Sequence, residues 1–260
     1  MLVKFWKYQG TGNDFIIFDN RSGVIDRANT QWFKQICDRR FGIGADGVMM
    51  LETAAGFDFE MVYYNSDGNP STMCGNGGRC MIAFAAQLGL IREQYHFLAV
   101  DGPHDAYMRG DIVHLRMQDV QEIEQHPDHF ILNTGSPHYV KFTDDILSVD
   151  VKNQGAAIRY SEAFMPSGIN VNFLEWHDGA LQIRTYERGV EDETLSCGTG
   201  VTAAALAAAI RQNLPEGVHT QTLHTMGGKL QVQFTRTGDA FTDIWLIGPG
   251  TFVFEGEIGV

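Results

Sequence analysis

Hydrophobic and polar positions alternate over many short stretches of this 260-residue chain and follow a helical spacing in only a few. Alternation predicts strands, whereas apolar residues at i, i+3, i+4 and i+7 predict amphipathic helices. Turns rich in Gly, Asn, Asp and Pro separate these stretches. The expected strands are 2–9, 14–19, 48–52, 57–64, two or three within 95–118, 129–133, 138–142, 169–176, 180–186, 219–225, 229–236, 241–247 and 251–255.

The same patterns predict four helices. Thr30 is the expected N-cap of the first, and Gly89 is a natural C-terminal signal for the second. The last helix consists almost wholly of Ala, Val, Leu and Ile, so we expect it to be buried on all sides. Two hairpins are predicted, turning at His177–Gly179 and at Gly227-Gly228. The expected helices are 30–39, the stretch after Cys74, one within 144–158, and Val201–Ile210.

Two cysteines occupy similar places in the two halves of the chain. Cys74 and Cys197 each precede a glycine-rich turn and then a helix, which we interpret as a weak internal repeat. The sequence therefore predicts an α+β fold of two pseudo-symmetric domains, each a curved, mostly antiparallel sheet around a central helix. We expect the domains to be residues 1–120 and 121–250, with 251–260 as a candidate to complete the first.

A cysteine at a helix start has a distinct chemistry. Unpaired backbone N–H groups and the helix dipole favour the thiolate there, so the pKa of a thiol can fall from about 8.5 to roughly 3.5–7.5. The same N–H groups can hold a carboxylate. Two such thiols facing one carbon could invert it, one as base and the other as acid, while the N–H groups stabilise the developing negative charge.

Composition excludes several classes of protein. The formal net charge of −13 offers no basic stripe for nucleic acid and disfavours an anionic membrane surface. No apolar run reaches the ~18 residues of a membrane span, and the N-terminus lacks the apolar core of a signal peptide. We therefore expect a cytoplasmic protein with reduced cysteines. The cysteines form no C-x-x-C pair and the histidines show no metal pattern, so no metal site is predicted.

Four segments together closely resemble diaminopimelate epimerase, in the order of that family: Gly10-Thr-Gly-Asn-Asp-Phe15, Met73-Cys-Gly-Asn-Gly-Gly-Arg79, Tyr186-Glu-Arg-Gly189 and Ser196-Cys-Gly-Thr-Gly200. The resemblance implies a pyridoxal-independent epimerase without cofactor that interconverts LL- and meso-diaminopimelate in lysine and cell-wall precursor synthesis. It also implies two pseudo-symmetric domains with the active site between them, and a homodimer.

The resemblance also assigns roles to single positions. Cys74 and Cys197 match the acid–base pair of the family. His138 and Glu187 match the groups beside one thiol and the other, where each would help to take or give the thiol proton. The positions that match holders of the distal amino-acid end of the substrate are Asn13, Asn65, Asn170 and Arg188. Those that match donors to the reacting carboxylate are Gly75, Asn76, Gly198 and Thr199.

Two positions depart from the family pattern. Ser136 stands where many members have Asn, and Gly47 stands where some have Gln. Both would lie near the substrate, so its detailed contacts are open, whereas both cysteines are retained.

Other functions remain as alternatives. Proline racemases and hydroxyproline epimerases resemble this family in fold and paired cysteines, but Asn76 and Tyr186–Gly189 favour diaminopimelate. A non-catalytic amino-acid-binding protein would need neither thiol. A nucleotide site is disfavoured because Gly10-x-Gly12 lacks the third glycine of the dinucleotide fingerprint and no G-K-S or G-K-T occurs. A structural disulfide between Cys74 and Cys197 is the remaining alternative to reactive thiols.

Overall fold

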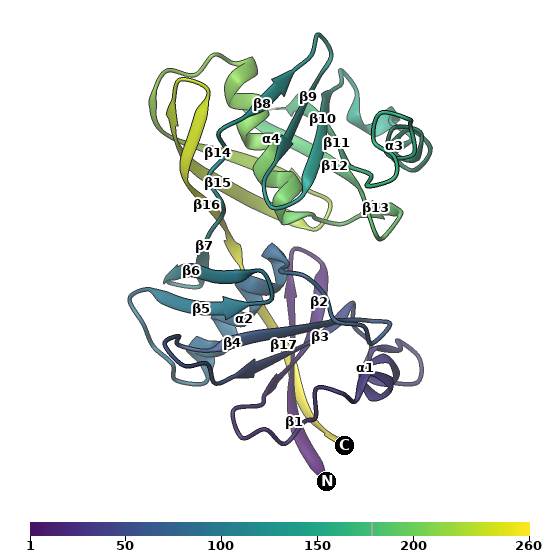
Figure 1. Cartoon of the computed structure of the whole chain (residues 1–260), viewed down its shortest axis with the longest axis vertical. Helices are drawn as coiled ribbons and strands as arrows, with labels where there is room; N and C mark the ends of the chain where they lie inside the picture. The colour runs from purple at the N-terminus through teal and green to yellow at the C-terminus, as the bar shows by residue number, and fades with distance from the viewer. Residues whose placement is uncertain (178) are drawn as a thin grey trace. The chain divides into compact units, whose positions relative to one another are not determined.

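The computed structural model of the chain describes residues 1–177 and 179–260 (Figure 1). The chain divides into two compact units, which are described separately. Unit 1 comprises Met1–Leu115 and Gly248–Val260, and unit 2 comprises Arg116–Ile247. No helix among the described residues has both the length and the apolar character needed to cross a membrane.

Unit 1 contains a mixed, mostly antiparallel arrangement of strands around one buried helix. Its elements are β1 (Leu2–Gly10), β2 (Asn13–Asp19), α1 (Thr30–Cys37), β3 (Gly47–Glu52), β4 (Glu60–Asn65), α2 (Gly75–Gln87), β5 (Tyr95–Ala99), β6 (Gly102–Arg109), β7 (Ile112–Arg116) and β17 (Thr251–Gly259). Strand β1 pairs antiparallel with both β2 and β17, whereas β2 runs parallel to β3. Helix α2 contacts β1, β2, β3, β6 and β17, so it is the centre of the unit.

Two glycines allow the chain to approach the start of α2 closely. A Cβ at Gly10, the last residue of β1, would lie 2.8 Å from the carbonyl oxygen of Asn76. A Cβ at Gly250, just before β17, would lie 2.4 Å from the carbonyl oxygen of Arg79. Both distances are shorter than van der Waals contact, so glycine is needed where the strands meet the helix backbone.

Unit 2 repeats this plan with different elements. They are β8 (Ile123–Gln125), β9 (His129–Asn133), β10 (Pro137–Phe142), a 3₁₀ turn η1 (Ile146–Ser148), α3 (Val151–Arg159), β11 (Asn170–His177), β12 (Ala180–Glu187), β13 (Asp192–Thr194), α4 (Gly198–Arg211), β14 (Gly217–Thr225), β15 (Gly228–Thr237) and β16 (Ala240–Pro249). Strands β10 and β11 run parallel, and so do β12 and β14, while the other pairs are antiparallel. Helix α4 contacts β9 to β12, β14 and β15, and it is buried from Gly200 to Ala209.

The predicted fold class is confirmed: the chain is an α+β protein in which short strands pack around a few helices. The expected burial of the alanine-rich helix is also confirmed. Because alanine side chains are small, strands can pack around this helix on several sides at native density.

Several local predictions are wrong. Asn29, rather than Thr30, is the N-cap of α1, and this helix ends at Cys37. Helix α4 begins at Gly198, three residues before the expected start, which makes Cys197 itself the N-cap. Strand β15 begins at Gly228, so the turn before it consists of residues 226 and 227. Strand β4 starts at Glu60 because residues 57–59 are not part of the ladder.

The sequence patterns also missed two short strands, β8 and β13, whose three residues are too few to show a period. Of the hairpin turn predicted at His177–Gly179, residue 178 lies outside the described residues, whereas the flanking strands β11 and β12 are paired antiparallel.

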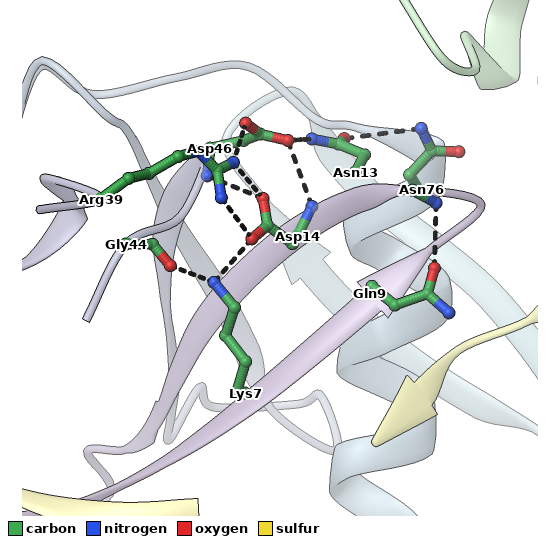
Figure 2. A network of polar contacts seen from close by, with 9 residues as sticks. Lys7, Gln9, Asn13, Asp14, Arg39, Gly44, Asp46 and Asn76 are labelled. Atoms are coloured by element: carbon green, nitrogen blue, oxygen red, sulfur yellow. Dashed lines mark hydrogen bonds and ion pairs between the residues drawn. The ribbon is translucent and has the colours of Figure 1, made fainter. Parts of the chain in front are cut away.

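A buried ion pair fastens β1 to β2 in unit 1 (Figure 2). Lys7 Nζ lies 2.7 Å from Asp14 Oδ2, and it also donates to the Gly44 carbonyl. Arg39 donates to both oxygens of the same carboxylate, at 3.0 and 2.6 Å. Burial favours the neutral form of Asp14, but hydrogen bonds and charge from Arg39 and Lys7 outweigh it and hold the pKa of Asp14 at about 2.

We expect Leu206→Ala to destabilise unit 2 by about 2–5 kcal/mol, because Leu206 is fully buried in α4 and its removal leaves a cavity. Leu147→Ala is the matched control: Leu147 is 86% exposed in the same unit, so its loss should change stability by no more than about 0.5 kcal/mol. The free energies of unfolding would be compared by urea titration. Equal effects of the two substitutions would contradict a core centred on α4.

Asp14→Asn should destabilise the chain by roughly 2 kcal/mol at neutral pH, since the folded state binds the proton of Asp14 less tightly than the unfolded state, whose pKa is about 3.9. The contribution is complete above about pH 4 and is lost as the pH falls toward 2. The difference between wild type and variant in urea titrations should therefore shrink on acidification. Asp19→Asn, which removes a more exposed single pair with Arg21, should cost less.

Candidate active site

In unit 1, Cys74 is the N-cap residue of α2. Its backbone is extended, with φ −122° and ψ 123°, and its carbonyl accepts the first helical hydrogen bond from the Gly78 N–H at 2.7 Å. The side chain is half-buried and its thiol is not in a disulfide. This placement directs the thiol to the positive end of the helix dipole, beside N–H groups that the helix itself leaves unpaired.

An asparagine oriented by a carboxylate faces this thiol. Figure 2 shows this asparagine, Asn13, between Asp46 and Asn76. Asn13 Nδ2 donates to Asp46 Oδ2 at 2.6 Å, and because a carboxylate only accepts, the orientation of the Asn13 amide is fixed. Asn13 Oδ1 therefore points the other way. It accepts from the Cys74 thiol at 3.6 Å and from Asn76 Nδ2 at 3.4 Å. The structure thus brings together three residues that the sequence predicted for the site.

A buried arginine lies under the same helix start. The Arg79 side chain is 0% exposed, and its hydrogen bonds go to neutral oxygens. Among the described residues no carboxylate pairs with it. Burial lowers the pKa of Arg79, while negative charge on the thiols of Cys80 and Cys74 would raise it. The acceptors are Gly75 O and Asn76 Oδ1 at 3.1 Å, Thr11 Oγ1 at 3.2 Å and Pro249 O at 3.3 Å.

The remaining positions of unit 1 lie in turns. Asn65 is exposed at the end of β4, where its backbone closes a turn by donating to Asn69 O at 2.9 Å. Gly47 begins β3, and a Cβ there would lie 2.5 Å from both the Tyr63 ring and the Tyr64 carbonyl oxygen. The departure at Gly47 therefore has a steric cause: the neighbouring strand occupies the space that a side chain would need.

In unit 2, Cys197 occupies the corresponding place at α4. It is the N-cap, with φ −118° and ψ 113°, and its carbonyl accepts from the Val201 N–H at 2.8 Å. The residue is only 6% exposed, and Sγ lies 3.5 Å from Thr199 Oγ1. The carbonyl of Thr199 accepts from Thr134 Oγ1 at 2.8 Å, which ties the turn before β10 to the helix start.

His138 lies in β10 and is fully buried. Its Nδ1 atom is 3.1 Å from Nδ2 of Asn172, on the neighbouring strand β11. Burial lowers the pKa of His138 to about 3, and the positive charge of Arg188 acts in the same direction. The imidazole is therefore neutral at neutral pH.

The start of β11 and the end of β12 carry the other predicted residues of this unit. Asn170 Oδ1 accepts from the Arg188 backbone N–H at 2.8 Å, and its Nδ2 donates to Pro137 O at 3.2 Å. Glu187 Oε2 accepts from Thr194 Oγ1 at 2.9 Å. The structure thus links Asn170 and Arg188 by a direct contact, and β10 and β11 place His138 opposite Asn170 in parallel register.

The two other cysteines are core residues, as predicted. Cys37 and Cys80 are buried, and burial raises the pKa of each thiol to about 12. None of the four cysteines is in a disulfide, so the two at helix starts are not joined to each other. Among the described residues, His, Cys, Asp and Glu side chains form no group of three or more that could hold a metal.

Sequence reasoning missed three residues that organise these sites. Asp46 orients Asn13, Arg79 lies beneath Cys74, and Asn172 contacts His138. The signal for Arg79 was its place in the motif around Cys74. Asn172 is a polar residue in the midst of the apolar run of β11, which marks a buried polar contact. For Asp46 the only signal was the glycine-rich loop that holds it.

Comparison with known proteins identifies the family. The sequence profile described as diaminopimelate epimerase matches residues 5–111 and 130–253. The diaminopimelate epimerase of Flavobacterium psychrophilum is 51% identical over 258 residues, which cover 98% of this chain and 100% of that protein. The diaminopimelate epimerase of Chlorobaculum tepidum is 41% identical, covering 96% of this chain and 98% of that one.

Solved structures share the fold. A phenazine biosynthesis protein of the PhzF family from Bacillus anthracis matches with a TM-score of 0.79 at 13% identity, covering both chains completely. A hydroxyproline epimerase from Agrobacterium vitis, with trans-4-hydroxy-L-proline bound, matches with a TM-score of 0.68 at 15% identity, covering 99% of this chain and 92% of that one. The profile and the full-length relatives lead to one conclusion: this chain belongs to the diaminopimelate epimerase family.

Proposed function

We propose that this protein is a cofactor-independent epimerase that interconverts LL- and meso-diaminopimelate by proton transfer at one α-carbon. The observation that carries the proposal is the pair of cysteines, not joined in a disulfide, at the N-caps of α2 and α4. The names of full-length relatives at 51% and 41% identity support the substrate. The reaction would serve lysine and peptidoglycan precursor synthesis.

In the proposed mechanism Cys74 and Cys197 face one substrate from opposite sides. One cysteine, as thiolate, takes the α-proton from the substrate and becomes a thiol. The electron pair left at carbon is delocalised into the adjacent carboxylate. The other cysteine, as thiol, gives its proton to the opposite face and becomes the thiolate. The stereocentre is inverted, no atom is gained or lost, and the two cysteines have exchanged protonation states.

Backbone N–H groups would stabilise the carboxylate as it gains charge. Those of Gly75 and Asn76 open α2, and those of Gly198 and Thr199 open α4. A helix start supplies preorganised donors and a positive dipole end, which is the requirement for stabilising a developing anion. The positive charge of Arg79, buried under α2, favours negative charge at the same place.

The remaining site residues complete the proposal. His138 and Glu187 would assist the thiols, and the distal amino-acid end of the substrate would be held by Asn13, Asn65, Asn170 and Arg188. The contact of Asn170 with the Arg188 backbone supports a shared role for these two residues. The contact of Asn13 with Cys74 supports a position of Asn13 at the reacting end as well.

The family resemblance further suggests a homodimer in the cytoplasm, and we include both in the proposal. Sedimentation of the purified chain over a range of micromolar concentrations tests the oligomeric state. A dimer is expected, and a monomer at all of these concentrations would contradict the proposed homodimer.

Incubation with LL-diaminopimelate in deuterium oxide should produce the meso isomer with deuterium at one α-carbon. Cys74→Ala and Cys197→Ala should each lower the rate of epimerisation by at least about 100-fold, because each removes a proton donor or acceptor that acts in the transition state. Product stereochemistry and deuterium content would be followed by chiral chromatography and mass spectrometry.

Cys37→Ala is the matched control, since Cys37 is a free but buried thiol away from either helix start. It should retain activity. Absence of exchange with diaminopimelate in folded, reduced wild-type protein would contradict the proposed substrate. Turnover of proline or 4-hydroxyproline instead would establish the alternative enzyme class, and binding without exchange would indicate an amino-acid-binding protein.

A further inference from the structure

His138 is part of a buried polar cluster with Asn172 and Thr185. The proposed mechanism gives no role to Asn172 or Thr185. Asn172 and His138 are both 0% exposed, and Thr185 on β12 is also buried. Their side chains come from three neighbouring strands, β10, β11 and β12. Because buried polar groups are costly without partners, hydrogen bonds to neighbouring groups determine how these side chains are oriented.

The direction of the Asn172 amide is set by two fixed neighbours. Nδ2 lies 3.1 Å from the Tyr139 carbonyl oxygen, which can only accept a hydrogen bond, so the atom there is the amide nitrogen. Oδ1 accepts from Thr185 Oγ1 at 3.0 Å. The reverse orientation would place the amide oxygen against the carbonyl oxygen of Tyr139.

This orientation determines the state of the imidazole. The same Asn172 Nδ2 lies 3.1 Å from His138 Nδ1. Because Nδ2 is only a donor, Nδ1 must be an acceptor and carries no proton. A neutral imidazole has one N–H, which must then be on Nε2. Among the described residues, Nε2 of His138 has no hydrogen-bond partner, so this N–H remains available.

The cluster also touches the helix that begins at Cys197. A Cβ added at Gly200 would lie 2.5 Å from Asn172 Oδ1 and 3.4 Å from Cys197 Sγ. Asn172 is therefore packed between the imidazole and the first turn of α4, and the second glycine of the Cys-Gly-Thr-Gly motif makes room for it.

We propose that Asn172 is a positioning residue that holds His138 as a neutral imidazole with its proton on Nε2, so that His138 donates a hydrogen bond at Nε2 and does not act as a base there. The tautomer follows from the geometry alone, whereas its use in catalysis rests on the proposed function. A thiolate next to Nε2 would accept this hydrogen bond. The thiol proton would pass between sulfur and substrate carbon, and the ring would keep its own proton throughout.

The neutral state of the ring agrees with its surroundings. Asn172, Thr185 and Tyr139 contribute no charge at neutral pH. Among the described residues the charge that acts on the ring is that of Arg188, which disfavours an imidazolium, and burial does the same. A histidine meant to accept a proton would be expected to have a carboxylate at Nδ1 instead of an amide donor.

The test is ¹⁵N NMR of the imidazole nitrogens in wild-type protein, with the His138 signals assigned by their loss in His138→Gln. The expected pattern is a protonated Nε2 and an unprotonated Nδ1 at pH 7, unchanged down to pH 5. A protonated Nδ1, or titration near the ordinary pKa of about 6.5, would overturn the proposal. This readout needs no substrate, so it separates failure of the tautomer assignment from failure of the proposed reaction.

Two variants sharpen the test. In Asn172→Asp a carboxylate faces Nδ1, so the proton should move to Nδ1 and the titration of His138 should shift to higher pH. In Thr185→Val the same cluster loses one hydrogen bond, but Tyr139 still fixes the amide, so the Nε2–H tautomer should persist. Loss of that tautomer in Thr185→Val, or its persistence in a folded Asn172→Asp protein, would contradict control by the Asn172 donor. If Asn172→Asp does not fold, the wild-type spectrum alone decides.

Discussion

The N-terminal ends of two buried helices impose the main constraint on this protein. A helix start has N–H groups without helical partners, and their partial positive charge must be compensated. At α2 and α4 the N-cap side chain is a cysteine that forms no side-chain cap bond to the helix. The cysteine side chains therefore do not take up these donors, while the strands pack tightly around the rest of each helix. Glycines such as Gly10 and Gly250, the alanines of α4 and the buried polar cluster around Asn172 all occur where strands pack closely against these two helices.

The two units meet the constraint with different side chains. Around Cys74 the neighbouring side chains include charged groups: Arg79 lies beneath the helix, and Asn13 connects the thiol to Asp46, whose carboxylate also pairs with Arg39. Around Cys197 the contacts include a hydroxyl and an amide: Thr199 lies beside the thiol, and Asn172 packs against the first turn.

Local sequence patterns were sufficient to locate most helices and strands and to place the two cysteines at helix starts. Alternation and helical spacing depend on residues close in the chain, so strands such as β1, β2 and β12 were predicted nearly to the residue. The cysteine–glycine motifs marked the helix starts for the same reason. Contacts across strands could not be predicted, because they depend on register: Asn13 meets Asp46 only because β2 and β3 run parallel from Phe15 and Gly47. Family resemblance supplied the roles of Asn170 and Arg188, which no local pattern indicates.

The pairing of β1 with β17 affects the order in which the chain can fold during synthesis. β17 follows the whole of unit 2 in the sequence, yet it belongs to unit 1 and covers one edge of β1. Domains generally fold as units once their residues have left the ribosome. Unit 2 is complete when Ile247 has emerged, but unit 1 must wait for residues that are made later. The half of the protein that is translated first is therefore the half that is completed last, and its edge strand β1 stays unpaired on that side during the interval.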